Sequence, residues 1–441
     1  MASTYLSKSA VTGNRRTFTI SAWVKRSGLG TAQQIYSSRS TASNVLGIYF
    51  QTDNTLWVTD YQSGAIMSFY TNRVFRDVNA WYHIVLEVDT TQATESSRVK
   101  IYVNGTQETS FSTASYPTQN RDLYINVTGS NHYIGTEQSG RYFDGAMAHV
   151  HFIDGTAYAA SDFGSFDANG IWTPNASPSV TYGTNGFFLN MASSGDMGND
   201  VSGNNNDFTV TGTVTQALDT PSNVFATLNP LDTAQSNATF SNGNTTWTTT
   251  SGYFWGRSTL GVSSGKYYFE AKLSSAPEHG HIGIVDEAPE NNTDSIESGA
   301  YNWGYKLSDG EVYNNGSGTA YGDTYTTGDI IGVALDLDNN KLYFSKNGTW
   351  QNSGDPESGA TGTGAVSITD PSSTNTGNYF FAVGDNASAT NGTWQTNFGN
   401  GYFGTTAVAS GNPDSAGLGI FEYTVPSGYY SLCTKNLATY G

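Results

Sequence analysis

The sequence predicts an all-β protein built from two β-sandwich domains in tandem. Its 441 residues include 50 Gly and 28 Tyr and many Ser, Thr and Asn, a composition that favours strands and turns over helices. No segment shows a helical apolar stripe of useful length. A unit of strand, Asp, turn, strand and Asn-Gly occurs twice, at 81–105 and at 328–348. We therefore expect each domain to be organised around one such hairpin.

Both hairpins are predicted from apolar residues that alternate with a period of two. In 328–348, Ile331, Val333 and Leu335 precede a tight turn, and Leu342 and Phe344 follow it. A period of two places these side chains on one buried face. The hairpin at 81–105 shows the same alternation around a longer polar loop, at Ile84, Leu86, Val88, Val99, Ile101 and Val103.

Further strands complete both domains. In the first domain we expect strands or hairpins at 15–27, 46–61, 131–137, 145–155, 186–191 and 206–212. In the second domain we expect them at 237–243, 266–274, 280–286, 302–316, 379–385, 393–399 and 428–437. Pro221 and Pro230 mark the connection between the domains, and its apolar residues predict that it packs. The predicted domains are residues 1–217 and 232–441, joined by a Pro-bounded linker at 218–231.

The charge balance argues against two classes of partner. With 19 basic and 37 acidic residues the net charge is −18, and such a surface repels nucleic-acid phosphates and anionic membranes. No run approaches the ~18 apolar residues of a membrane span, so we expect no membrane insertion. The N-terminal segment lacks the apolar stretch of a signal peptide. Cys433 is the chain's one cysteine, which excludes an internal disulfide.

Two families are recognisable in these segments. Most of residues 5–212 resembles the laminin-G-like, concanavalin-A-like jelly roll, through "FTISAWVKRS", "AWYHIVLEVDTT", "RVKIYVNG" and "FDGAMAHVHFIDG". Roughly residues 240–400 resemble a SPRY domain, a related curved sandwich, through "GKYYFEAKL", "NWGYKLSDGEVYNNG" and "GDIIGVALDLDNNKLYFSKNG". The Gly-Asp-x-Ile-Gly-Val hairpin with its Asn-Gly turn is that family's most specific signature, and it is intact here. The resemblance implies two jelly-roll sandwiches.

Nearly the whole chain also resembles virion proteins of tailed bacteriophages, notably marine ones. The segments that carry this resemblance are "YLSKSAVTGNRRTFTISAWVKRS", "FIDGTAY", "DVSGNNNDFT", "DTPSNVFATLNPLD" and "GYYSLCTKNL". It implies a non-enzymatic virion protein, assembled in the host cytoplasm, that forms a fibre-like or capsid-attached appendage and contributes to adsorption to host-surface glycans. An alternative is a capsid decoration protein that stabilises the shell. The expected partners are other virion proteins, a host-surface glycan and further copies of the chain, with a trimer favoured.

A glycan hydrolase is the alternative from a different class. Hydrolases of the concanavalin-A-like fold that resemble laminarinases carry Glu-x-Asp-x-x-Glu on one strand, which directs the carboxylates toward one cleft. Here Glu87 and Asp89 share a face, but Gln92 occupies the position of the third carboxylate. We therefore interpret the segment as a solvated hairpin face and predict no catalytic residue.

No cofactor and no metal-ligating residue is predicted. His149 and His151 alternate on one strand, as do His279 and His281, but neither pair has a third ligand at zinc spacing. We expect structural roles for these four histidines and a sheet-filling role for His83.

Calcium remains open as an alternative for the first domain. Some laminin-G-like domains bind Ca²⁺ through Asp and Asn side chains and loop carbonyls, and calcium takes six to eight oxygen ligands. Asp196, Asn199 and Asp200 form a cluster of this kind. The same residue types are also what an ordinary turn requires.

Aromatic side chains are the candidate ligand-binding residues. Tyr and Trp rings stack on the apolar faces of sugars, and neighbouring polar groups bind hydroxyls. Tyr301, Trp303 and Tyr305 follow one another on a predicted strand, and Tyr313 lies on the next one. In the SPRY family the loops at one edge of the sandwich form the ligand surface, so the resemblance implies that these four residues bind a ligand. Core packing is the competing role, above all for Trp303.

Overall fold

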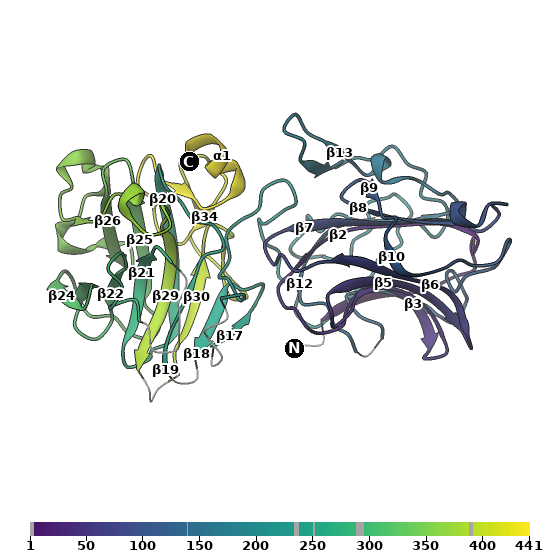
Figure 1. The fold of residues 1–441 in the computed structure, drawn as a ribbon, viewed down its shortest axis with the longest axis horizontal. Coiled ribbons are helices and arrows are strands. Elements are labelled where there is room, and N and C mark those ends of the chain that lie inside the picture. Colours follow the sequence, from purple (N-terminus) through teal and green to yellow (C-terminus); the bar gives the residue numbers. More distant parts are fainter. Residues whose placement is uncertain (1–3, 139, 233–237, 250–251, 288–294, 388–390) are drawn as a thin grey trace. The chain divides into compact units, whose positions relative to one another are not determined.

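The structure is a computed structural model that describes residues 4–441 apart from residue 139 and segments 233–237, 250–251, 288–294 and 388–390. The chain divides into two compact units, Met1–Gln216 (unit 1) and Ala217–Gly441 (unit 2). Each unit consists of two main, largely antiparallel sheets that lie face to face (Figure 1). The predicted fold class, an all-β protein with two jelly-roll sandwiches in tandem, is confirmed.

Unit 1 contains an eight-stranded and a six-stranded sheet. The larger sheet has, in spatial order, β10 (Phe111–Ser115), β6 (Ala65–Val74), β5 (Thr55–Gln62), β4 (Asn44–Phe50), β3 (Gln33–Thr41), β11 (Asn131–Ile134), β1 (Tyr5–Ser9) and β16 (Thr209–Thr211). The smaller has β15 (Phe187–Leu189), β12 (Gly145–Asp154), β2 (Thr17–Arg26), β7 (Trp81–Asp89), β8 (Val99–Val103) and β9 (Thr106–Gln107). A separate hairpin joins β13 (Gly164–Phe166) to β14 (Trp172–Pro174).

Alternation along the strands builds the core of unit 1. On β4, Leu46, Ile48 and Phe50 are fully or almost fully buried in the space between the sheets. On β5, Leu56 and Val58 join the same core. Because successive side chains of a strand point to opposite faces, the residues between them lie on the outer face of the sheet. This outer face carries the groove described below.

Unit 2 repeats the architecture with a nine-stranded and a six-stranded sheet. The larger sheet contains β17 (Ala238–Ser241), β18 (Thr246–Thr249), β30 (Thr393–Asn397), β20 (Lys266–Ser275), β25 (Ile330–Asp336), β26 (Lys341–Lys346) and β27 (Thr349–Trp350), with β28 (Val366–Ser367) beside β26 and β35 (Tyr430–Ser431) beside β20. The smaller contains β19 (Gly252–Arg257), β29 (Phe380–Ala387), β21 (Gly280–Val285), β22 (Trp303–Lys306), β23 (Glu311–Asn314) and β24 (Ser317–Ala320).

Short elements connect these sheets. Two small hairpins pair β31 (Tyr402–Phe403) with β32 (Thr406–Ala407) and β33 (Asn412–Pro413) with β34 (Ile420–Phe421). The 3-10 helices are η1 (Glu95–Ser97), η2 (Ala160–Asp162), η3 (Gln351–Ser353), η4 (Pro356–Thr361) and η5 (Pro371–Ser373), and the α-helix is α1 (Thr434–Tyr440). Of the helices that the structure describes, none has the length and apolar character needed to cross a membrane.

A late segment of the chain covers the outer face of the larger sheet of unit 2. Phe421, Val425 and Tyr429 pack there on Tyr268 and Tyr343 in a second apolar cluster. The Phe421 and Tyr268 ring centroids are 5.0 Å apart. We call residues 414–431 the covering segment.

The two ends of unit 2 lie side by side. The backbone N–H of Ala226 donates to the carbonyl of Leu432 at 2.9 Å, and that of Thr434 donates to Val224 at 2.9 Å. Phe225 and Leu228, from the segment that we predicted as a packed linker, are buried within unit 2. These contacts place residues 224–226 and 432–434, near the two ends of the unit, in one short ladder.

The predicted strand at 428–437 needs correction. Only Tyr430–Ser431 pairs as a strand, and the chain then forms helix α1 from Thr434 to Tyr440. The helix brings the Asn436 amide to Asp414 Oδ2 at 2.8 Å and packs Leu437 against the core. A continued strand would turn alternate residues away from these partners, so local packing outweighs the strand-like composition.

Candidate functional site

Unit 1 carries a groove of about 570 Å³ on the outer face of its eight-stranded sheet. Strands β3, β4, β5 and β6 form its floor, and Glu137 and Arg141 form one rim. We call it the sheet-face groove. Its lining residues are Gln34, Arg39, Ala42, Ser43, Val45, Gly47, Tyr49, Trp57, Thr59, Tyr61, Ala65, Ser68, Glu137 and Arg141.

Aromatic rings form the centre of the groove floor. The Trp57 ring stacks on Tyr70 with centroids 4.6 Å apart and contacts Tyr49 at 4.9 Å. Trp57 Nε1 donates to Ser68 Oγ at 2.9 Å, which fixes the orientation of the indole. Tyr61, two outward positions further along β5, is 40% exposed. The floor therefore presents ordered rings to an apolar or planar group.

The rim is held by one carboxylate and two guanidinium groups. Glu137 accepts ion pairs from Arg39 and from Arg141, each at 3.0 Å. The Arg141 guanidinium also lies 4.4 Å from the centre of the Tyr49 ring, a cation–π contact. The three charges leave the rim with one net positive charge, in a chain whose net charge is −18.

Three buried polar atoms of groove residues have no hydrogen-bond partner within the described chain. They are Gln34 Oε1, Tyr49 Oη and Arg39 Nε. Burial raises the pKa of Tyr49 well above its ordinary value, so its hydroxyl keeps its proton. Because buried polar groups are rarely left unpaired, such atoms mark places where a ligand or water completes the bonding. With its aromatic floor and these polar atoms, the groove can stack on a flat or apolar group and form hydrogen bonds with it.

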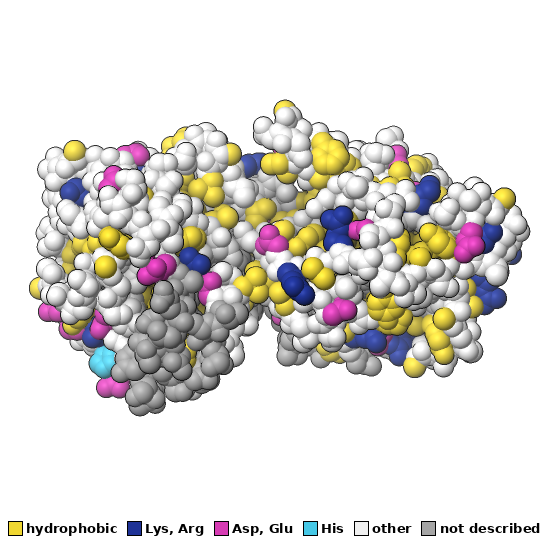
Figure 2. Space-filling view, in the orientation of Figure 1, with side chains coloured by type: hydrophobic (Ala, Val, Ile, Leu, Met, Phe, Trp, Pro, Cys, Tyr) yellow, Lys and Arg dark blue, Asp and Glu magenta, His cyan; other side chains and the backbone are white. Residues whose placement is uncertain are grey.

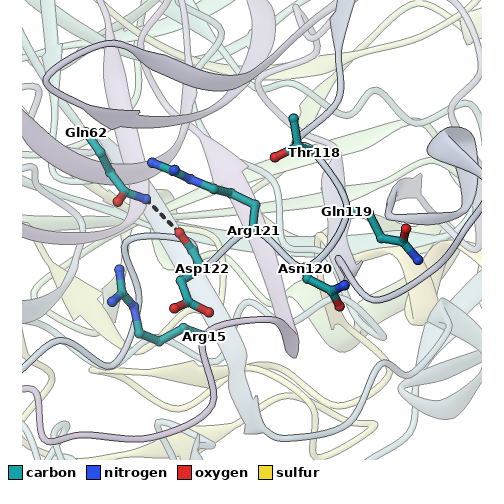
Figure 3. Close-up of a pocket in the computed structure, with 7 residues that line it drawn as sticks. All are labelled: Arg15, Gln62, Thr118, Gln119, Asn120, Arg121 and Asp122. Atoms are coloured by element: carbon teal, nitrogen blue, oxygen red, sulfur yellow. Dashed lines mark hydrogen bonds between the residues drawn. The ribbon is translucent and has the colours of Figure 1, made fainter.

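A second hollow of unit 1 has a different character. It measures about 490 Å³, and all of its lining residues are polar. Figure 3 shows Arg15 and Arg121 on the same side as Gln62, with Asp122 between the two arginines. Thr118, Gln119 and Asn120 form the remaining wall. We call it the arginine cavity.

The four predicted aromatic residues do not form one surface. Trp303 is 6% exposed and Tyr305 is fully buried, and both belong to the core of unit 2. The Tyr305 hydroxyl donates to the backbone carbonyl of Asp323. Tyr301 is half-buried against the same core. With two rings directed inward from β22, a shared ligand surface of all four residues is not what the structure shows.

Tyr313 lies among charged side chains of unit 2 instead. Lys306 Nζ is 4.6 Å from its ring centre, and its hydroxyl donates to Asp309 Oδ2 at 3.2 Å. Burial and the neighbouring Asp309 carboxylate raise the pKa of Tyr313 to about 12. Ligand contact through any of the four residues stays a prediction.

The carboxylates considered for hydrolysis are held in local bonds. Glu87 Oε1 lies 2.7 Å from Lys100 Nζ, and Glu87 Oε2 accepts from the Tyr102 hydroxyl at 2.7 Å. Asp89 Oδ1 accepts from the backbone and hydroxyl of Thr91 at 3.0 and 2.6 Å. These bonds organise a hairpin and leave neither group poised as an acid or nucleophile.

His83 is fixed as a neutral ring by its neighbours. Trp172 Nε1 donates to His83 Nδ1 at 3.0 Å, so the ring proton lies on Nε2, which is 2.8 Å from Ser21 Oγ. Burial lowers the pKa of His83 to about 3. His83 therefore donates to Ser21 and cannot take its proton as a general base.

Three of the other histidines, His149, His151 and His281, have structural partners. His151 is buried, stacks on Phe188 with centroids 4.0 Å apart and has Tyr182 Oη 3.0 Å from its Nδ1. Its neighbour His149 also packs on Phe188. His281 Nε2 lies 2.7 Å from Glu297 Oε1 in unit 2, while His279 is half-exposed. Within the described segments, no group of three His, Cys, Asp or Glu residues is placed to hold a metal ion.

The calcium candidate has an organised but internally bonded carboxylate. Asp200 accepts from the backbone N–H groups of Phe188, Ser202 and Asn206 at 2.8–2.9 Å and from the Ser202 hydroxyl at 2.9 Å. Asp196 and Asn199 are exposed. Calcium binding here stays an open alternative to the prediction of no cofactor.

Sequence reasoning missed both hollows of unit 1 for different reasons. The groove had a signal, because Tyr49, Trp57 and Tyr61 occupy the outward positions of the predicted hairpin at 46–61. The arginine cavity had none, because Arg15, Gln62 and Arg121 come from three distant segments that only the fold brings together.

Family comparisons identify both domains. Residues 2–161 match the concanavalin A-like lectin/glucanases superfamily, and residues 266–364 match the SPRY domain. A laminin-G-like, concanavalin-A-like domain and a SPRY domain are therefore present, as the sequence predicted.

Relatives and solved structures cover only parts of the chain. Ran-binding protein 9 of Danio rerio and of Homo sapiens is 38% identical over 89 residues, which is 20% of this chain and 15% and 12% of those proteins. The SPRY domain of human HERC1 is 19% identical, covers 38% of this chain and 96% of that chain, and has a TM-score of 0.31. A pentraxin from Limulus polyphemus is 15% identical, with 35% and 71% covered and a TM-score of 0.27.

These comparisons contradict the predicted function. The relatives are Ran-binding proteins 9 and 10 of animals and not virion proteins, so the prediction of a phage virion structural protein is wrong. This correction includes the adsorption appendage and the capsid decoration protein. The physical reason is that the quoted segments are strands and turns that build a β-sandwich, and a fold does not determine a function.

Proposed function

We propose that this chain is a non-enzymatic protein-interaction protein, and that its laminin-G-like unit holds a segment of a partner protein in the sheet-face groove. The observation that carries the proposal is the open groove with an aromatic floor and unpartnered polar atoms. The SPRY domain and the Ran-binding relatives support protein interaction as the class of function. The chain spans less than a fifth of these relatives, so the proposal does not extend to their particular partners.

The chemistry of the groove suits a short peptide segment. Trp57 and Tyr61 offer ring surface to one apolar side chain, and buried aromatic contacts dominate the energy of protein interfaces. Gln34 Oε1 can accept from a backbone N–H, and Arg39 Nε can donate to a backbone carbonyl. A volume of about 570 Å³ fits a few residues, not a folded surface.

The same groove offers no reaction chemistry. Glu137 is the single carboxylate among its lining residues, and two arginines already bind it. None of the lining residues is a histidine or cysteine. Binding without turnover is therefore the function that this geometry supports.

Peptide display on the whole chain tests the proposal. Panning a random peptide library should enrich sequences that bind the wild type and lose at least about tenfold affinity for Trp57→Ala, because the ring floor is removed. Tyr61→Ala, at a more exposed position, should weaken binding less. Phe166→Ala is the control, since this ring is 57% exposed on the β13 hairpin outside the groove.

Three results would contradict the proposal. Enriched peptides could bind Trp57→Ala and Tyr61→Ala as tightly as the wild type, which would place the peptide site elsewhere. The library could yield no peptide that depends on these residues. Finally, an oligosaccharide array could show binding that Trp57→Ala abolishes while peptides bind nothing, which would make the groove a sugar site.

A further inference from the structure

The arginine cavity brings together three segments of unit 1. Arg15 precedes β2, Gln62 ends β5, and residues 118–122 form a loop. Two bonds tie the loop and the residues directly after it to β5. Gln62 Nε2 donates to the Asp122 carbonyl at 3.0 Å (Figure 3), and Asp60 Oδ2 accepts from the Tyr124 N–H at 2.6 Å. The cavity wall is therefore fixed before any ligand binds, which lowers the entropy cost of binding.

The charges around the cavity are unbalanced toward the cationic side. The Asp122 carboxylate is already paired, because its Oδ1 lies 2.6 Å from Arg16 Nε. Arg15 uses its Nε to donate to the Leu123 carbonyl at 2.8 Å, a bond that directs the rest of the guanidinium. Arg121 Nε is buried without a hydrogen-bond partner in the described chain. Two guanidinium groups thus border a cavity whose one carboxylate has its own arginine.

The buried carboxyl group of Asp60 lies close to the cavity and to the charges of both arginines. Asp60 lies beneath Gln62, whose Nε2 donates to Asp60 Oδ1 at 2.8 Å. Burial raises the pKa of Asp60 to about 6, while the charges of Arg121 and Arg15 act to lower it. Both guanidinium charges therefore lie close enough to act on one buried carboxyl group.

The distribution of arginine supports a specific role for unit 1. Nine of the chain's ten arginines lie in this unit, although the chain is acidic. Unit 1 has 12 basic and 16 acidic residues against 7 and 21 in unit 2, which gives net charges of −4 and −14. Figure 2 shows several of these basic side chains, in dark blue, on the visible face of unit 1. Arginine binds carboxylate and phosphate oxygens through paired N–H groups more specifically than lysine does.

We propose that the arginine cavity is an oxyanion-binding site, in which Arg15 and Arg121 hold a carboxylate or phosphate group and Thr118 or Asn120 donates a further hydrogen bond. The fully polar lining selects against apolar ligands. The site is separate from the sheet-face groove, and it does not depend on the function proposed for that groove.

Calorimetric titration of the whole chain tests the site. Inorganic phosphate, succinate and a short oligoglutamate peptide are each added at constant ionic strength, with sodium chloride as the balancing salt. Arg121→Gln and Arg15→Gln should each weaken binding by about tenfold, since each removes one charge-assisted pair. Arg76→Gln is the matched control, because Arg76 is an exposed arginine of unit 1 that does not line the cavity.

The outcomes separate the possible sources of the oxyanion. If phosphate binds more tightly, the ligand of the cavity is a free phosphate or a phosphoryl group. If oligoglutamate binds more tightly, the ligand is an acidic segment of a protein. Arg121→Lys keeps the charge but not the paired geometry, so an intermediate affinity supports the site even if Arg121→Gln does not fold. Absence of binding, or equal weakening by Arg76→Gln, would overturn the proposal, because only general charge attraction would remain.

Discussion

The outer face of the larger sheet is open in unit 1 and covered in unit 2. In unit 1 the outer face of the eight-stranded sheet carries the sheet-face groove, with Trp57 and Tyr61 accessible on its floor. In unit 2 the outer face of the nine-stranded sheet carries Tyr268 and Tyr343, on which the covering segment packs, and both side chains are completely buried. Similar aromatic side chains on similar sheets thus line an open groove in one unit and form a second core in the other.

The bonds of the covering segment explain the difference. Glu270, on β20, accepts from the backbone N–H groups of Glu422 and Tyr423, both at 2.9 Å, and from the Tyr268 hydroxyl at 2.9 Å. One buried carboxylate therefore holds the segment on the sheet while the aromatic rings pack beneath it. An outward-facing aromatic residue is evidence of a ligand surface only when no other part of the chain covers it.

Truncating one ring on each face should give the largest contrast. Phe421→Ala, in the covering segment, should lower the free energy of unfolding of unit 2 by about 3–5 kcal/mol, because it opens a cavity in a packed cluster. Tyr61→Ala, on the open face, should change that of unit 1 by no more than about 0.5 kcal/mol. Urea unfolding of both variants, followed by hydrogen exchange for each unit, measures the two values. Equal losses would show that the two faces do not differ as described.

The pH dependence of unit 2 should report the carboxylate that holds the covering segment. Burial raises the pKa of Glu270 to about 7, above its ordinary value of 4.5. The folded unit therefore binds this proton more tightly than the unfolded chain. The stabilisation that comes from binding this proton is fully present below about pH 4.5 and is lost as the pH rises through about 7. From about pH 5 to 8, wild type should lose about 2–3 kcal/mol relative to Glu270→Gln.

The informative quantity is the difference in the free energy of unfolding between wild type and Glu270→Gln, because other groups also titrate in this range. Asp323→Asn, at an exposed position of unit 2, is the control and should follow the wild type at every pH. Denaturant titrations at four or five pH values give the curve. A parallel pH profile for wild type and Glu270→Gln would show that Glu270 does not hold the segment through its charge state.

The smallest expected effect concerns the rim of the open face. Arg141 covers the Tyr49 ring at 4.4 Å, and a partly exposed contact of this kind contributes about 0.5–1 kcal/mol. A double-mutant cycle of Arg141→Ala and Tyr49→Leu should give a coupling energy in that range. The same cycle with Arg76→Ala in place of Arg141→Ala should give none. A coupling of zero for Arg141 would mean that the rim is not fixed in position.

The sequence was sufficient for the architecture because alternation is a local property. The apolar residues predicted at 84, 86 and 88 and at 331, 333 and 335 are all buried between sheets, as the period of two required. The two families were recognisable from the same hairpins. These features depend only on residues that are close together in the sequence, so the sequence alone reveals them.

The sites depended on contacts that no local pattern contains. Trp303 looked like a candidate ligand residue, yet its ring contacts Tyr379, 76 positions later, in the core. Tyr268 is covered by Phe421, which follows it by more than 150 positions. Whether an aromatic side chain is buried was therefore decided by distant segments. The functional class failed for a related reason, because resemblance between strands reports a fold and not a partner.

Because segments near its two ends lie side by side, unit 2 is suited to insertion into another protein. Ala226 bonds to Leu432 and Thr434 bonds to Val224, so segments near the first and last residues of the unit lie side by side. A domain with adjacent ends can be placed within a surface loop of another protein without stretching either chain. It can also be permuted, with its present ends joined by a short linker and new ends opened in an exposed turn such as that around Asn315 and Gly316. The SPRY unit is therefore suited to transfer as an insertion as well as a terminal fusion.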